Sequence, residues 1–195
     1  CDLYQALSAC VCRQHDDQNG RLAIADSKQL YKPGGALANL ERAVYAALQA
    51  KSLRPSGWRA VFASLLGEVE PALRDIPWYA DYEEQAPIDC ASAEIDACAR
   101  NFADARAAAG IELLDVHAVA IFPGEFNRTV GRLDSKGALL TEATLQLARK
   151  MIQRHPAEKT YVLCDKHGGR NRYSGPLQHV WPEHWIKIIH ESRAE

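Results

Sequence analysis

The stretch TYVLCDKHGGR, residues 160–170, carries much of what this sequence indicates about fold and function. A short run of apolar, β-prone residues ends at Asp165 and opens into a loop rich in charge and glycine. In α/β proteins, functional groups gather where strands end at their carboxyl edge. A carboxylate there is a natural ligand for a hard cation such as Mg²⁺ or Mn²⁺, and Lys166 and Arg170 could hold a phosphate beside it. The same residues also fit a plain turn, in which Asp165 caps the loop and the basic side chains are solvated.

The composition is that of an ordinary globular protein. The chain has 195 residues, of which 47% are hydrophobic and 25% are charged, and its formal net charge is −2. This charge gives no global signature of nucleic-acid binding, which would therefore need a local basic patch. No apolar run approaches the roughly 20 residues of a membrane span, and no secretory signal is visible. The six cysteines show no metal-binding spacing. We expect a cytoplasmic protein with reduced thiols and no membrane partner.

Helical periodicity and short β-prone runs alternate along the chain. Apolar spacing and flanking breakers predict helices over 2–13, 36–50, 57–66, 92–110, 125–133 and 138–155. Gly110 is expected to close the fourth of these as its C-cap. The runs 113–122 and 160–165 are predicted strands of one sheet. Strand, helices and strand in this order predict an α/β fold with a mixed or parallel sheet flanked by helices.

A second informative stretch is IADSKQLYKPGG, residues 24–35. It places Asp26, Ser27 and Lys28 between a short apolar run and a long helix. A hydroxyl and an ammonium group side by side in a loop could hold a phosphodiester, one as a donor and the other as a point charge. The alternative is an Asx or Ser turn that leads into the helix.

Together, these two stretches and FPGEFNRTV (122–130) between them resemble the type 2 ribonucleases H, the ribonuclease HII family. The resemblance implies a ribonuclease H-like fold and an endonuclease that cleaves RNA in RNA–DNA hybrids with two metal ions, Mg²⁺ or Mn²⁺. It makes Asp165 a catalytic metal ligand and places Ser27 and Lys28 near substrate phosphates. Lys166, Arg170 and Tyr173 are expected to contact the nucleic acid.

The chain also departs from that family's pattern. The family's first Asp-Glu motif would lie upstream of Cys1 and its last carboxylate beyond Glu195, so residues 1–195 are expected to be a fragment of one ribonuclease H-like domain. Residues 54–110 exceed the family's usual connection and are expected to form a helical insertion within it. Two alternatives stay open: a nucleic-acid-binding module without catalysis, and an unrelated α/β enzyme that handles phosphates.

Overall fold

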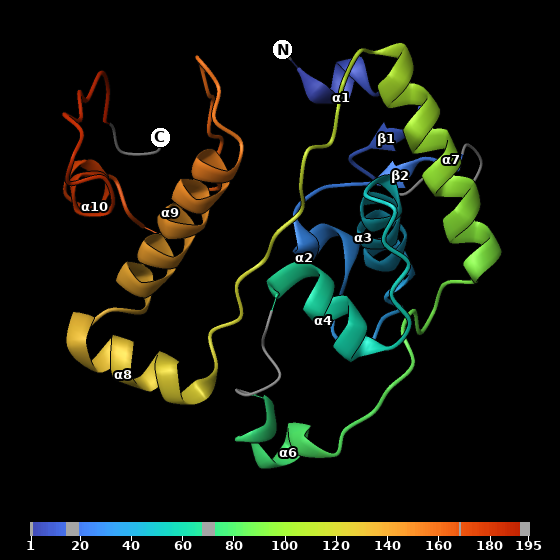
Figure 1. The fold of residues 1–195 in the computed structure, drawn as a ribbon, viewed down its shortest axis with the longest axis horizontal. Coiled ribbons are helices and arrows are strands. Elements are labelled where there is room, and N and C mark those ends of the chain that lie inside the picture. Colours follow the sequence, from blue (N-terminus) through green and yellow to red (C-terminus); the bar gives the residue numbers. More distant parts are fainter. Residues whose placement is uncertain (1, 15–19, 68–72, 168, 192–195) are drawn as a thin grey trace. The chain divides into compact units, whose positions relative to one another are not determined.

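The computed structural model describes residues 2–14, 20–67, 73–167 and 169–191. The chain divides into two compact units, Cys1–Val116 and His117–Glu195. Unit 1 contains α1 (Leu3–Ala6), β1 (Val11–Cys12), β2 (Leu22–Ala23), α2 (Ser27–Leu30), α3 (Ala38–Ala50), α4 (Trp58–Leu66), α6 (Pro77–Ala80) and α7 (Ser92–Ala108) (Figure 1). Unit 2 contains α8 (Pro123–Leu133), α9 (Lys136–Arg154) and α10 (Ser174–Val180).

Unit 1 is held together by α3 and α7, which pack side by side over the short parallel pair β1 and β2 (Figure 1). Leu22 of β2 and Ala46 of α3 are 1% and 0% exposed and lie in one apolar cluster with Phe102 of α7. Burial of such side chains supplies the main favourable free energy of folding. The full cluster is Leu7, Cys10, Val11, Leu22, Ala46, Cys98, Ala99 and Phe102.

Helix α7 ends as its sequence predicts. Gly110 has a φ of +63°, the left-handed conformation that a glycine adopts without steric cost. The N–H of Gly110 bonds the carbonyl of Ala107 at 3.2 Å, and the N–H of Ile111 bonds the carbonyl of Arg106 at 2.9 Å. This pair of bonds is a Schellman motif, which satisfies carbonyls at the end of the helix.

Unit 2 is built around the long helix α9, against which α8 and α10 both pack (Figure 1). Ser135 caps the start of α9, because its side chain accepts a hydrogen bond from the N–H of Ala138 at 3.2 Å. Arg149 of α9 bonds the carbonyl of Val180 at the end of α10 and the carboxylate of Glu183, the latter at 2.7 Å. These bonds fix α10 and the turn after it to α9.

The prediction of a ribonuclease H-like mixed sheet flanked by helices is wrong. The described residues are mostly helical, and their one sheet is the parallel pair of two-residue strands β1 and β2. Neither of the two predicted strands, 113–122 and 160–165, forms a strand. A β-prone run becomes a strand only when a neighbour completes its ladder of hydrogen bonds. Here Val119 lines a hollow beside α8 and α9 instead, and Leu163 is 93% exposed.

Residues 54–110 include α4, α6 and α7, so the described part of this stretch is mostly helical. Helix α7 supplies four buried residues, among them Cys98 and Phe102, to the centre of unit 1. Whether the stretch is an insertion into a ribonuclease H-like domain stays a prediction.

Candidate functional site

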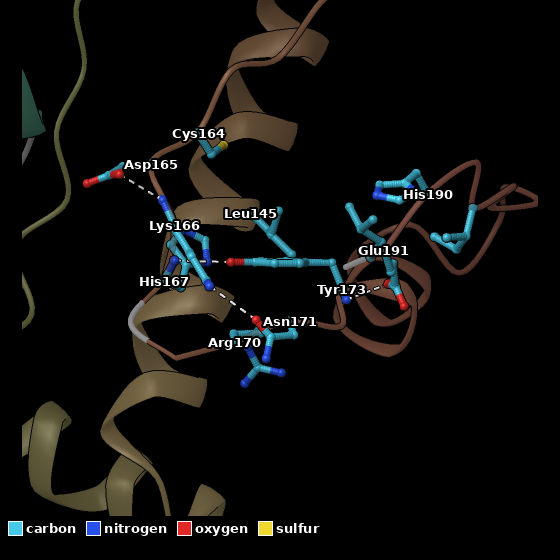
Figure 2. Close-up of a pocket in the computed structure, with 12 residues that line it drawn as sticks. Leu145, Cys164, Asp165, Lys166, His167, Arg170, Asn171, Tyr173, His190 and Glu191 are labelled. Atoms are coloured by element: carbon cyan, nitrogen blue, oxygen red, sulfur yellow. Dashed lines mark hydrogen bonds between the residues drawn. The ribbon is translucent and has the colours of Figure 1, made fainter. Parts of the chain in front are cut away.

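A hollow of about 540 Å³ in unit 2 is the candidate site. Its volume lies within the roughly 300–1,000 Å³ of small-molecule pockets. Residues 164–167 and 170–173 form one wall, the segment 188–191 forms another, and α9 and α10 close the rest (Figure 2). The lining residues are Leu145, Cys164, Asp165, Lys166, His167, Arg170, Asn171, Tyr173, Leu177, Ile188, His190 and Glu191.

Tyr173 spans this hollow from one wall to the other. Its hydroxyl accepts a hydrogen bond from the backbone N–H of His167 at 3.0 Å, and its own backbone N–H donates to Glu191 Oε1 at 2.7 Å. Figure 2 shows the ring of Tyr173 between these two ends, with Lys166 and His167 on one side and His190 and Glu191 on the other. The pocket therefore has two chemically different ends.

Cationic side chains mark the first end. Lys166 Nζ donates to Asn171 Oδ1 at 3.1 Å, so the ammonium group lies against the side chain of Asn171 (Figure 2). Arg170 Nε donates to Thr141 Oγ1 at 2.9 Å, and that hydroxyl donates in turn to the carbonyl of Gly137 at 2.8 Å. Thr141 is 1% exposed, so α9 provides Arg170 with a rigid, buried support. Within the described part of the chain, each cation thus uses one N–H donor in an anchoring hydrogen bond and has further donors for a ligand.

His167 lies behind the two cations and is 5% exposed. Burial, and secondarily the positive charge of Arg170, lowers the pKa of His167 below its usual value, while Asp165 has a smaller opposite effect. The imidazole is therefore neutral near pH 7. Its Nδ1 is buried and has no hydrogen-bond partner within the described part of the chain. Its ring centroid lies 5.6 Å from that of Tyr173 in a tilted arrangement.

The carboxylates around the hollow are arranged as backbone caps. Asp165 Oδ1 accepts the N–H of Lys166 at 2.8 Å, and the Asp165 carboxylate points away from Tyr173 in Figure 2. Glu191 Oε1 accepts the N–H groups of both Tyr173 and Ser174, at 2.7 and 3.0 Å, at the start of α10. These bonds match the turn interpretation of Asp165.

The described residues bring no cluster of three or more metal-ligating side chains together. Mg²⁺ needs several oxygen ligands in near-octahedral geometry. Across residues 2–14, 20–67, 73–167 and 169–191, no group of three or more His, Cys, Asp or Glu side chains could hold a metal ion. Asp165 as a catalytic metal ligand stays a prediction that these residues by themselves do not support.

The structure separates the predicted site residues into two sets. Asp165, Lys166, Arg170 and Tyr173 line the same pocket, which is built entirely from unit 2. Ser27 and Lys28 belong to unit 1, where they are exposed on the single-turn helix α2. Asp26 caps that helix by accepting the N–H of Lys28 at 2.8 Å, which is the turn alternative.

Trp58 and Glu125 do not line this pocket. Trp58 packs against Phe62, Tyr79 and Tyr82 at centroid distances of 5.3–5.7 Å, and its Nε1 donates to the carbonyl of Tyr82. These contacts favour packing as the role of Trp58. Glu125 lines a separate hollow of about 270 Å³ beside α8 and α9.

The sequence interpretation missed the two residues that support the site from behind, Thr141 and Glu191. A signal for Thr141 exists, because it lies four residues before the buried Leu145 on the same face of a predicted helix. A hydroxyl on a buried face needs a partner. Nothing in the local sequence of Glu191 indicates that it caps a helix 17 residues earlier.

None of the described helices is long and apolar enough to cross a membrane. In comparisons with known proteins, no family model, no curated protein and no solved structure matches this chain.

Proposed function

We propose that this chain is a nucleic-acid-binding module that holds a phosphate group at Lys166 and Arg170. The observation that carries the proposal is the placement of two anchored cations on one wall of a ligand-sized hollow. A guanidinium held at Nε still presents its two terminal nitrogens, the fork that suits a phosphate, and an ammonium adds a mobile point charge. An unsupported surface cation would lose more side-chain entropy on binding.

Cleavage is not part of this proposal. The family resemblance implied metal-dependent hydrolysis of RNA–DNA hybrids, and that activity rests on Asp165 and on carboxylates that the described residues do not bring beside it. The non-catalytic alternative needs only the cations and the hollow. The cytoplasm is the compartment we propose, because all five cysteines among the described residues are free thiols.

The test is the affinity for fluorescently labelled single-stranded DNA and for an RNA–DNA hybrid of the same sequence, measured by anisotropy over a salt series. Lys166→Ala and Arg170→Ala should each weaken binding by roughly tenfold, because a hydrogen bond to a charged group contributes about 1.5 kcal/mol. Each should also make the salt dependence shallower by about 0.7 in the log–log slope for a single strand. Lys150→Ala is the matched control, because Lys150 is exposed on α9 and outside the pocket.

Equal affinities of wild type, Lys166→Ala and Arg170→Ala would sink the proposal. Magnesium-dependent cleavage of the hybrid by the wild-type chain, abolished in Asp165→Asn, would favour the nuclease instead. Circular dichroism of each variant shows whether the fold is retained.

A further inference from the structure

The two ends of the pocket carry opposite charges, and this limits how many phosphates can enter it. Lys166 lies toward the hydroxyl of Tyr173 and Arg170 lines the same hollow, whereas Glu191 lies at the backbone end of Tyr173 (Figure 2). Glu191 Oε1 caps α10, so the carboxylate is fixed in place. A phosphate at the cationic end is attracted, and a second phosphate near Glu191 is repelled.

The first end offers more donors than an internal phosphodiester can use. Lys166 has three N–H donors, one of which is bonded to Asn171, and Arg170 has five, one of which is bonded to Thr141. The Tyr173 hydroxyl accepts from His167 and can still donate its own hydrogen. An internal diester carries a single negative charge on two free oxygens. A terminal monoester carries about −1.5 to −2 and presents three oxygens.

The middle of the pocket suits a flat, partly apolar group. Three apolar side chains, Leu145, Leu177 and Ile188, line the same hollow as the ring of Tyr173. A nucleobase can stack on such an aromatic ring whatever its identity. At the far end, the second oxygen of Glu191 can accept a hydrogen bond from an amino or hydroxyl group of the ligand.

From this arrangement we propose that the pocket binds a single nucleotide through its terminal phosphate monoester, with the phosphate at Lys166 and Arg170 and the base along Tyr173 toward Glu191. The inference rests on the proposed function and narrows it, because it assigns the pocket to a phosphorylated end and not to the interior of a strand. A nucleoside phosphomonoester of this kind is found both at the end of a nucleic acid and in a free mononucleotide.

The experiment uses the whole chain and single-stranded oligonucleotides of one sequence, labelled internally, with a 5′-phosphate, a 3′-phosphate or hydroxyls at both ends. We expect at least one of the phosphorylated ends to bind about tenfold or more tightly than the hydroxyl-ended strand. Lys166→Ala and Arg170→Ala should remove this preference. Competition by adenosine 5′-monophosphate then distinguishes a free nucleotide from a strand end as the ligand. Full displacement of the labelled strand points to a free nucleotide, and weak displacement points to a strand end. Both results support a terminal monoester.

Glu191→Gln tests the rejection of the second phosphate. Glutamine keeps an oxygen that can cap α10 but removes the negative charge. We expect the variant to bind the hydroxyl-ended strand about threefold to tenfold more tightly, so that the preference for a phosphorylated end shrinks. Glu183→Gln is the control, because Glu183 pairs with Arg149 and does not line the pocket.

Two results overturn the inference in different ways. If all three strands bind equally and Lys166→Ala weakens each of them, the pocket binds internal phosphates, so the proposed function survives and the terminal monoester is wrong. If no strand and no mononucleotide binds, both proposals fail together.

Discussion

The hydrogen bond between Arg170 Nε and Thr141 Oγ1 is the contact on which the cationic end depends, and it can be tested directly. Thr141→Val keeps the shape of a side chain that is 1% exposed but removes the acceptor at 2.9 Å. A hydrogen bond to a charged group contributes about 1.5–3 kcal/mol. Arg170 is only half-buried, and water can replace part of the lost bond. We therefore expect the lower limit, about 1.5 kcal/mol.

A double-mutant cycle isolates this pair from other effects of each substitution. Thr141→Val, Arg170→Ala and the double variant are compared by hydrogen exchange of backbone amides in α9, read by mass spectrometry. Loss of about 1.5 kcal/mol should make exchange of these amides roughly tenfold faster in Thr141→Val. The double variant should show little further loss, so that the coupling free energy is about 1.5 kcal/mol. Coupling below about 0.3 kcal/mol, the scatter of independent sites, would refute the reasoning.

Two further predictions concern His167 and the cores. The pKa of His167 is lowered in the folded chain, mainly by burial, from its usual value near 6.5. At a pH below 6.5 the unfolded chain therefore binds more protons at His167 than the folded chain does. The free energy of unfolding falls as the pH is lowered from 6.5 toward the pKa of the folded state. Urea unfolding between pH 7.5 and 5.5 should therefore show a shallower loss in His167→Gln, by at most about 1.4 kcal/mol per pH unit, and parallel curves would contradict this. Leu22→Ala should cost about 2–5 kcal/mol of unfolding free energy, because Leu22 is 1% exposed in the core of unit 1, whereas Leu163→Ala at 93% exposure should change it by less than about 0.5 kcal/mol. Equal effects of the two leucine substitutions in a urea titration would contradict the assigned core.

Long helices were predictable because their signals are local. The periodicity over 138–155 corresponds to α9, and Gly110 lies at the end of α7 as expected. The helix predicted over 125–133 corresponds to α8, which begins two residues earlier at Pro123. Which face is buried was less predictable. Val44 has the helical spacing of one apolar face with Leu40 and Leu48, yet Val44 is 38% exposed, whereas Tyr45 and Ala46 are buried.

The strands could not be predicted, since a strand depends on residues elsewhere in the chain. The runs 113–122 and 160–165 have the composition of buried strands, but the described residues provide no ladder for either. The grouping of the side chains that follow residue 163 was more predictable than the strands. Lys166, Arg170 and Tyr173 do meet around one hollow, because residues so close in sequence stay together whatever the architecture. Ser27 and Lys28 are far from this loop in the sequence, so local proximity says nothing about them, and they belong to unit 1.

The cap that Glu191 places on α10 has a kinetic consequence. Glu191 holds the segment that follows α10 to the start of that helix. This segment buries little apolar surface, since Trp185 and Ile189 are 93% and 91% exposed. Segments with few buried apolar contacts open at a lower free energy than the helices beside them. Each opening breaks the hydrogen bonds that the N–H groups of Tyr173 and Ser174 donate to Glu191. We therefore expect ligand residence time to depend on the lifetime of these Glu191 hydrogen bonds as well as on the contacts that Lys166 and Arg170 make with a phosphate.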